Sequence, residues 1–219
     1  MLQRVLEPEV MDSADEAKAY DAMDHVAVNT RFCDDLLALR PAPARVLDVG
    51  TGTARIPIEL CQRAPSCKVV ATDLARHMLS RARHNVEAAG LGERIELRHV
   101  DAKASGLPAR AFDVVMSNSI VHHIPDPSAA IADMIARVAP AGLLFVRDLM
   151  RPVDDAAVHA LVSTYARDEA PDARALFEAS LRAALTVDEL IAMLAPLGVP
   201  ARSIGATSDR HWTIAWRAP

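Results

Sequence analysis

Residues 45–58 read Arg45-Val-Leu-Asp-Val-Gly-Thr-Gly-Thr-Ala-Arg-Ile-Pro-Ile58, which is the most informative stretch of the chain. An apolar run typical of a buried strand leads into Asp48 and then into a tight turn at Gly50 and Gly52, after which a helical pattern begins. Glycine lets the backbone take positive φ and approach a ligand closely, and the start of a helix presents N–H groups that have no partner within the helix. The stretch therefore predicts a polar ligand at the carboxyl end of the first strand.

Outward from this turn, short β-branched runs alternate with longer helical patterns, which is typical of an α/β fold with a parallel sheet covered by helices. Ser128 is expected to cap one helix, and Thr186 with Glu189 to form a capping box. Gly90 and Gly198 are expected to end helices in a left-handed conformation. Strands are predicted at 45–49, 68–72, 95–99, 112–117, 143–147, 201–205 and 211–216, and helices at 54–63, 75–89, 128–138 and 187–197.

Two segments do not follow the alternation. Residues 1–40 look helical, and residues 150–185 are predicted to form two helices separated by Pro171. Because ligands of open parallel sheets bind beyond the strand ends, both segments are candidates for lids, with extra packing helices on the rim as the alternative. The predicted parts are a helical lid (1–40), a Rossmann-like core (41–149), inserted helices on the substrate side (150–185), and a C-terminal helix with the last two strands (186–219).

Composition excludes several classes of protein. The 219 residues are 51% apolar and 24% charged, which fits one globular domain and disfavours disorder. With a net charge of −5, the chain lacks the broad positive field that binds nucleic acids. No apolar run is long enough to span a membrane. The three cysteines suggest neither a disulfide framework nor a zinc site, and acidic residues near the start argue against a signal peptide. We expect a cytoplasmic protein with a small-molecule partner, no nucleic acid and no membrane insertion.

The identity of the ligand is narrowed by what surrounds the glycines. A dinucleotide-binding motif has a third glycine at the position where this chain has Arg55. The Gly-Lys-Ser/Thr sequence of a nucleoside-triphosphate loop is also absent after the turn. Asp48 stands two residues before the first glycine, where a carboxylate repels phosphate and suits an ammonium or a sulfonium.

Two further acids follow the next two strands. Asp73 ends the second strand, where a carboxylate can accept both ribose hydroxyls of an adenosine, and the apolar Leu74 and Met78 can face the adenine. Asp101, with Ala102 beside it, is placed to bind the adenine amine. Each acid taken singly can also be a solvated strand end or a helix cap, but the set favours a site for an adenosine and a cation.

The residues resemble the class I S-adenosylmethionine-dependent methyltransferases, above all the small-molecule branch with the ubiquinone and menaquinone enzymes. The similarity is carried by the following motifs: Val46-Leu-Asp-Val-Gly-Thr-Gly-Thr-Ala54, Asp73, Val100-Asp-Ala102, Phe112-Asp-Val-Val-Met-Ser-Asn118 and Val121-His-His-Ile-Pro-Asp-Pro127. The resemblance implies a doubly wound seven-stranded sheet in the order 3-2-1-4-5-7-6, with the last strand antiparallel and helices on both faces. It also implies that the methionine end of S-adenosyl-L-methionine lies over Gly50, Thr51 and Gly52. The family usually has a third glycine at Ala54, where we expect a methyl group to be tolerated.

The resemblance also locates the chemistry. It places the acceptor past the fourth strand, over Asn118, which we count with the cofactor-binding residues. Methyl transfer is an in-line displacement that needs alignment more than a catalytic metal, and a general base only where the acceptor is protonated. His122 and His123 are the strongest acid/base candidates, with packing or capping as the alternative for each. The pair also suits a His-His-x-x-Asp metal cluster, but no second carboxylate is spaced for it, so no metal site is predicted.

Other candidates lie in the two lid segments. Tyr20 and His25 could reach the transfer site, although their spacing of five keeps them off one helical stripe. Arg147 and Tyr165 are candidate substrate-binding residues, Arg147 for a carboxylate or phosphate, with an ion pair to a neighbouring aspartate as the alternative.

The predicted function is methyl transfer from S-adenosyl-L-methionine to an N, O, S or C atom of a small molecule, with S-adenosyl-L-homocysteine as product. The alternatives are a protein that senses this cofactor without turnover and a nicotinamide-dependent oxidoreductase. The sequence leaves open the acceptor and the oligomeric state, for which a homodimer is one alternative.

Overall fold

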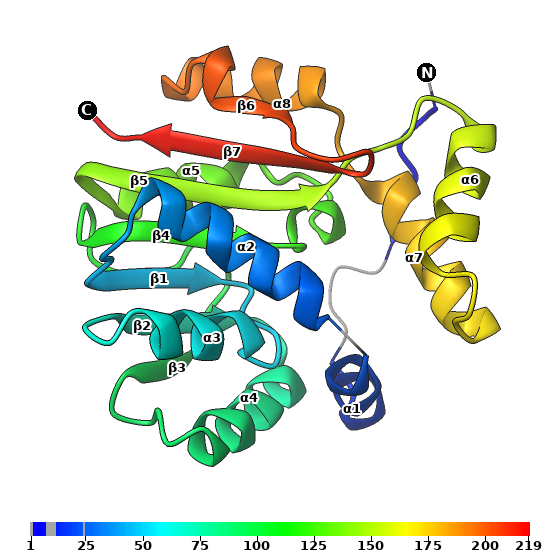
Figure 1. Cartoon of the computed structure of the whole chain (residues 1–219). Coiled ribbons are helices and arrows are strands. Elements are labelled where there is room, and N and C mark those ends of the chain that lie inside the picture. Colours follow the sequence, from blue (N-terminus) through cyan, green and yellow to red (C-terminus); the bar gives the residue numbers. More distant parts are fainter. Residues whose placement is uncertain (1, 8–11, 24) are drawn as a thin grey trace. The chain divides into compact units, whose positions relative to one another are not determined.

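A computed structural model of the chain describes residues 2–7, 12–23 and 25–219 (Figure 1). The strands form one sheet in the order β3-β2-β1-β4-β5-β7-β6, in which β3, β2, β1 and β4 pair in parallel and β7 runs antiparallel to β6. The predicted α/β fold and strand order are confirmed. The strands are β1 (Arg45–Val49), β2 (Lys68–Asp73), β3 (Ile95–His99), β4 (Phe112–Asn118), β5 (Val138–Leu149), β6 (Ile204–Ala206) and β7 (His211–Arg217).

The helices follow the predicted pattern closely between residues 45 and 199. Thr186 and Glu189 form the predicted capping box, and Gly90 and Gly198 take positive φ of 67° and 79°. The α-helices are α1 (Ala14–Ala22), α2 (Val26–Leu39), α3 (Arg55–Arg63), α4 (Arg76–Ala88), α5 (Ser128–Arg137), α6 (Asp155–Tyr165), α7 (Pro171–Ala183) and α8 (Val187–Leu194), and the 3-10 turns are η1 (Val121–His123), η2 (Ala195–Leu197) and η3 (Ala201–Ser203).

Three local expectations are corrected. Ser128 does not precede α5 as a cap but is its first residue, and the Asp126 carboxylate accepts hydrogen bonds from the Ser128 N–H and hydroxyl groups. Pro171 begins α7 instead of lying between two helices, because the first turn of a helix needs no N–H from it. Residues 2–7 are not helical; in the first 40 residues the described helices are α1 and α2 alone.

The chain divides into two compact units. The first, here called the glycine-turn unit, comprises Val10–Asn118, Ala129–Val146 and Arg217–Pro219. In it, α2 lies across one face of the sheet (Figure 1), and Phe32 of α2 packs edge-on against Phe145 with 4.9 Å between ring centroids. Both side chains are buried, so this contact is part of the core that supports the first strand and its turn.

The second, here called the histidine unit, comprises Met1–Glu9, Ser119–Ser128 and Arg147–Trp216. Its core includes Val158 and Val162 of α6 and Leu181 of α7, with Leu2 packed against them. The N-terminal stretch is tied to this core by two backbone hydrogen bonds, from Leu2 N–H to the carbonyl oxygen of Val153 and from Val5 N–H to that of Arg182, both 3.1 Å. In the part of the chain that the structure describes, no helix has both the length and the apolar character needed to cross a membrane.

Candidate functional site

A pocket of about 590 Å³ opens beside the glycine turn, within the glycine-turn unit. Its volume is in the usual range for small-molecule sites. The sequence-predicted residues in its lining are Tyr20, His25, Asp48, Gly50, Thr51, Gly52 and Asn118. The pocket therefore joins the end of β1, the end of β4 and the two N-terminal helices around one space.

The turn itself is held by the second strand. The N–H groups of Gly50 and Thr51 both donate to the carbonyl oxygen of Thr72 at 2.8 Å, and Gly52 N–H donates to Asp73 Oδ2 at 2.7 Å. Gly50 and Gly52 take positive φ of 74° and 55°, which explains why glycine is needed there. The N–H groups expected to be unpartnered belong to the start of the following helix, whereas these three in the turn are bonded, so the turn itself is a poor cradle for a phosphate.

Asp48 is a buried acid in the wall of the pocket. It is only 3% exposed, and burial raises the pKa of its carboxyl group to about 7, to which the negative charge of Asp73 contributes. The Thr51 side chain acts in the opposite sense, because its hydrogen bond to the carboxyl group lowers the Asp48 pKa. A buried acid and a neighbouring hydroxyl at one pocket wall suit a ligand with a cationic group and a polar neighbour.

Helix α1 covers the turn. The Tyr20 ring lies 3.7 Å from the position that a Cβ atom on Gly52 would take. The next residue, Asp21, accepts hydrogen bonds from Arg55 at 2.9 Å on each oxygen, from Arg81 at 2.7 Å and from Asn85 at 2.9 Å. Burial alone would raise the pKa of Asp21, but these donors outweigh burial and lower the pKa to about 2. Asp21 is thus an anionic clasp that fastens α1 to α3 and α4.

The rings of Tyr20 and His25 pack together, with centroids 5.0 Å apart and a tilt of 40°. A spacing of five keeps two residues off one stripe of a continuous helix, but here the chain leaves α1 after Ala22 and enters α2 at Val26. The change of direction brings both side chains to the pocket.

The residues predicted to hold an adenosine are not in the pocket lining that the structure describes. Besides binding Gly52, Asp73 accepts a hydrogen bond from Ala75 N–H at 2.8 Å. Met78 is buried in a cluster with Ala17 and Ala75, against which Tyr20 packs. The other members lie along the strand ends: the Leu74 carbonyl contacts His99, Asp101 accepts from Lys103 N–H, and Ala102 follows Asp101 in the same loop.

The two predicted substrate-binding residues, Arg147 and Tyr165, lie in the histidine unit. Arg147 is buried in β5 and donates from Nε to the Thr213 hydroxyl at 3.0 Å. Tyr165 ends α6, donates its hydroxyl to Asp209 at 2.6 Å and has the Arg210 guanidinium 3.3 Å from its ring centre. Each has a structural partner within the unit, and neither lines the pocket beside the glycine turn.

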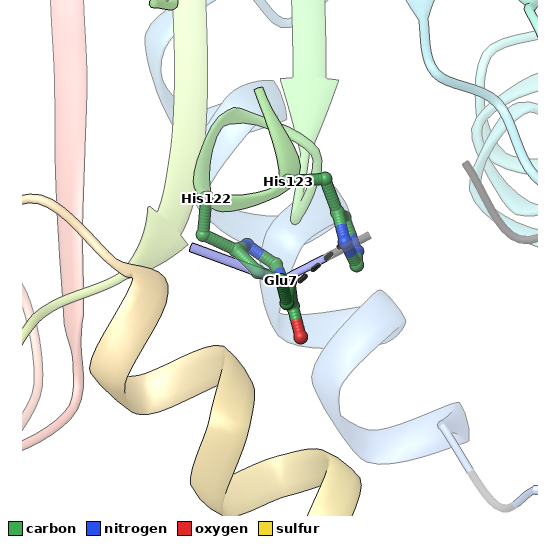
Figure 2. A group of neighbouring side chains, drawn as sticks. All are labelled: Glu7, His122 and His123. Atoms are coloured by element: carbon green, nitrogen blue, oxygen red, sulfur yellow. Dashed lines mark ion pairs between the residues drawn. The ribbon is translucent and has the colours of Figure 1, made fainter. Parts of the chain in front are cut away.

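His122 and His123 meet a residue that the sequence pattern did not single out, the N-terminal Glu7 (Figure 2). Glu7 Oε1 lies 3.0 Å from His123 Nδ1 and 3.5 Å from His122 Nε2. On its other side, His122 Nδ1 is 2.5 Å from the fully buried Asp148 Oδ1, and Asp148 also accepts from Val121 N–H. No spacing rule reveals Glu7, because it precedes His122 by 115 residues and lies outside any helix or strand.

The charges of this cluster stabilise one another. Burial would lower the pKa of His122, but Asp148 and Glu7 outweigh burial and raise it. The same contacts act in the opposite sense on the acids: burial would raise the pKa values of Asp148 and Glu7, but the histidines and hydrogen-bond donors lower both. The cluster thus holds two carboxylates and an imidazole of raised basicity in a protein interior.

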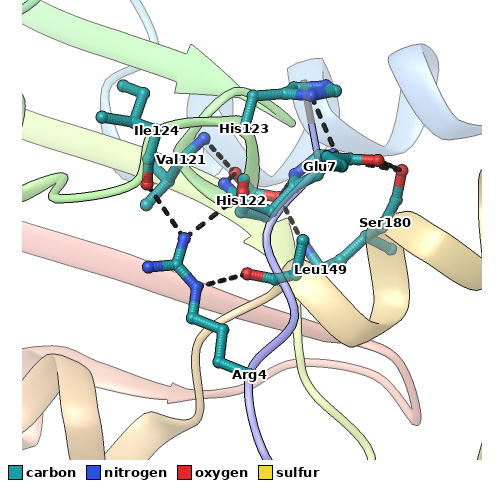
Figure 3. A network of polar contacts seen from close by, with 10 residues as sticks. Arg4, Glu7, Val121, His122, His123, Ile124, Leu149 and Ser180 are labelled. Carbon is teal, nitrogen blue, oxygen red and sulfur yellow. Dashed lines mark hydrogen bonds and ion pairs between the residues drawn. The ribbon is translucent and has the colours of Figure 1, made fainter. Parts of the chain in front are cut away.

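Arg4 fixes the N-terminal stretch against the loop that carries the histidines (Figure 3). Its guanidinium donates to the carbonyl oxygens of Ala183 at 2.6 Å, Pro125 at 2.8 Å and Ile124 at 2.9 Å, with His122 at 3.3 Å. A planar cation with five donors can bridge several carbonyls in this way, which a lysine cannot.

Comparison with known proteins identifies the core of the chain. Residues 46–142 match the family described as "Methyltransferase domain". The chain is 37% identical to a demethylmenaquinone methyltransferase of Thermus thermophilus over 53% of this chain and 52% of that protein. It is 33% identical to a trans-aconitate 2-methyltransferase of Variovorax paradoxus over 77% of this chain and 60% of that protein. The chain thus spans about half the length of the curated relatives it matches.

A solved structure supports the same fold along nearly the whole chain. A SAM dependent methyltransferase from Aquifex aeolicus superposes with a TM-score of 0.69, covering 95% of this chain and 100% of that one at 16% identity. At this identity the likeness concerns the fold alone, and it agrees with the strand order described above. Residues 46–142 of this chain therefore match a methyltransferase domain, and the chain has the Rossmann-like fold of the solved methyltransferase structure.

Proposed function

We propose that the chain is an S-adenosyl-L-methionine-dependent methyltransferase that acts on a small molecule. The observation that carries the proposal is the buried carboxyl group of Asp48 at the wall of the glycine-turn pocket. A carboxylate in that place attracts a cation, and a sulfonium cofactor with an ammonium group offers two. A nicotinamide dinucleotide fits less well, because its pyrophosphate would meet Asp48 and N–H groups that Thr72 and Asp73 already engage.

The pocket residues fit the methionine end of this cofactor. We infer that Asp48 and Thr51 hold its polar groups, while Gly50, Gly52 and Asn118 shape the space around them. The adenosine end is assigned to Asp73, Leu74, Met78, Asp101 and Ala102 as a proposal. Because Ala17 and Tyr20 of α1 pack against Ala75 and Met78, the adenosine would reach Met78 only when α1 shifts.

When bound, the cofactor would supply a methyl group on a positively charged sulfur, and its transfer to a lone pair of the acceptor would leave the carbon–sulfur electron pair on sulfur as S-adenosyl-L-homocysteine. The chain has to align the acceptor and exclude water. Tyr20 and His25 line the pocket, so we assign them to orient an acceptor and to take its proton where it has one.

The acceptor stays open within the class of small molecules. The relatives are named for demethylmenaquinone, trans-aconitate and malonyl-[acyl-carrier protein], which are chemically different molecules. We therefore include a quinol, a carboxylic acid and a thioester-linked acid among the candidates, and we keep a cytoplasmic location as part of the proposal. Arg147, Tyr165, His122 and His123 remain candidates for the acceptor side.

Cofactor binding is tested by equilibrium titration of labelled S-adenosyl-L-methionine. Asp48→Asn should weaken binding by at least about tenfold, which corresponds to about 1.4 kcal/mol. Asp34→Asn, at a half-exposed carboxylate in α2 of the same unit, is the matched control and should bind within about twofold of wild type. Equal affinity of wild type and Asp48→Asn would contradict the assignment of the pocket, and equal affinity of Asp73→Ala would remove the ribose assignment.

Turnover separates an enzyme from a sensor. Formation of S-adenosyl-L-homocysteine is measured with a panel of quinols, carboxylic acids, phenols, amines and thiols. Acceptor-dependent product formation that Tyr20→Phe or His25→Ala reduces would support the transferase. Tight cofactor binding without product across the panel would favour the sensing alternative.

A further inference from the structure

Glu7, His122 and His123 bring three metal-ligand atoms together in the histidine unit (Figure 2). One carboxylate oxygen and two imidazole nitrogens all lie within 4.8 Å of one another. The His-His-x-x-Asp pattern at 122–126 lacked a second suitably spaced carboxylate, and Glu7, from the N-terminal segment of the same unit, brings a carboxylate to the two histidines.

The distances suit ligands of one metal ion. Tetrahedral ligands about 2.0–2.1 Å from zinc are separated by about 3.3 Å, and Glu7 Oε1 lies 3.0 Å and 3.5 Å from the two imidazole nitrogens. The 3.5 Å contact to His122 is long for a hydrogen bond, while the 3.0 Å contact to His123 Nδ1 is within hydrogen-bond distance. Both nitrogens thus face the same carboxylate oxygen at separations that also suit ligands of one metal ion.

The groups behind the ligands orient them. Asp148 Oδ1 contacts Nδ1 of His122, which leaves Nε2 to face Glu7, the arrangement found behind metal-bound histidines. Ser180 Oγ donates to both Glu7 oxygens at 3.2 Å (Figure 3). In charge, a divalent cation with two neutral imidazoles would balance the carboxylates of Glu7 and Asp148.

We propose that Glu7, His122 and His123 bind one divalent first-row transition-metal ion of the zinc class, with Asp148 as a positioning residue for His122. Two imidazoles and one carboxylate are the donor set that such ions accept, whereas magnesium and calcium prefer oxygen ligands throughout. Three protein ligands leave a coordination position for water or for an anionic oxygen of a small molecule.

The test is metal binding by the full, untagged chain after treatment with a chelator, with neither cofactor nor acceptor present. Titration with Zn²⁺ is followed by calorimetry, and titration with Co²⁺ by its visible absorption. We expect one ion per chain, with affinity reduced at least tenfold in Glu7→Gln and in His123→Ala. His159→Ala, which removes an exposed histidine of α6, should leave the affinity unchanged. Binding equal in wild type and both ligand variants would overturn the proposal.

Two further measurements keep the result decisive if a variant folds poorly. Far-UV circular dichroism reports on the fold of each variant, and zinc should raise the melting temperature of wild type but not that of folded ligand variants. X-ray absorption of wild type with one equivalent of Zn²⁺ should show two imidazoles and no sulfur. A shell containing sulfur from the buried Cys33, Cys61 or Cys67, or oxygen alone, would contradict the assignment. Because the cofactor is not used, failure here leaves the proposed methyl transfer untouched, and the reverse also holds.

Discussion

Burial of the Asp48 carboxyl group is unfavourable unless the charged form has a partner of opposite charge. At 3% exposure and with a pKa of about 7, it is partly ionised at neutral pH in an environment that favours its protonated form. A bound cation would reverse that preference, because an opposite charge stabilises the anion. The residue therefore trades stability of the free chain for affinity toward a cationic ligand.

Asp48→Asn should stabilise the free chain, and by more at high pH. The pKa of Asp48 is raised from its unfolded value near 4, so the folded chain keeps its proton up to about pH 7 while the unfolded chain loses it near pH 4. The wild-type chain therefore loses stability as the pH rises from about 4 to about 7, whereas the Asp48→Asn variant does not. Urea denaturation should show the difference in free energy of unfolding growing by about 3 kcal/mol between pH 5 and pH 8. A difference that is constant with pH would contradict the raised pKa.

At Ala54 the motif alone does not explain why the family usually has glycine. Alanine is expected to be tolerated there because it adds only one methyl group. The structure places Ala54 at φ 62° and ψ 24°, the left-handed region that favours glycine, at the start of α3. The left-handed backbone conformation at this position, which the sequence motif does not reveal, is the physical reason why the family usually has glycine there.

At the scale of elements, α1 is held over the glycine turn by few apolar contacts and one charged clasp. Ala17 is its buried residue, and Asp21 supplies four of its polar contacts. A helix of nine residues has little stability of its own, so its position depends on this clasp.

Asp21→Asn should loosen α1. Arg55 and Arg81 would lose their anionic partner, and we expect faster hydrogen exchange over residues 14–22 and a several-fold higher rate of cofactor dissociation. Hydrogen-exchange mass spectrometry and stopped-flow fluorescence measure the two effects. Asp35→Asn, which breaks an exposed pair with Arg31 in α2, is the control and should change neither. Unchanged exchange in α1 would show that the clasp does not hold it.

Most elements could be predicted, and the failures have specific causes. The strand order and the capping box at Thr186 follow from local pattern and family resemblance. The break between α1 and α2, which brings Tyr20 to His25, has no glycine or proline to mark it. The path of residues 2–7 depends on Arg4 and on carbonyl groups more than a hundred residues away, and no local pattern encodes such contacts.

At the scale of the whole molecule, the described polar sites divide between the two units. All the lining residues of the glycine-turn pocket belong to one unit, and all members of the Glu7 cluster belong to the other. The motifs that carry the family resemblance include the glycine turn, His122 and His123 but not Glu7, so the sequence could identify the first site far better than the second.

Deletion of residues 1–7 tests this division. It removes Arg4 and Glu7, so we expect metal binding to be lost and the free energy of unfolding to fall by roughly 2–4 kcal/mol through the lost hydrogen bonds. Cofactor affinity should stay within about threefold of wild type, because no described pocket residue lies in the deleted part. Calorimetry with cofactor and with Zn²⁺, together with thermal unfolding, measures all three. A parallel loss of cofactor and metal binding would show that the sites are coupled.

The route of the N-terminal stretch also has a consequence for biosynthesis. Arg4 donates to the carbonyl of Ala183, a residue 179 positions later in the chain. At about 5–20 residues per second, a ribosome needs roughly 10–35 s to make the intervening polypeptide. The glycine turn, with β1 and β2 close together in sequence, can fold within that interval, whereas Glu7 has to wait for α7 before Ser180 can hold it. During synthesis the proposed metal site is therefore among the last parts of this chain to assemble.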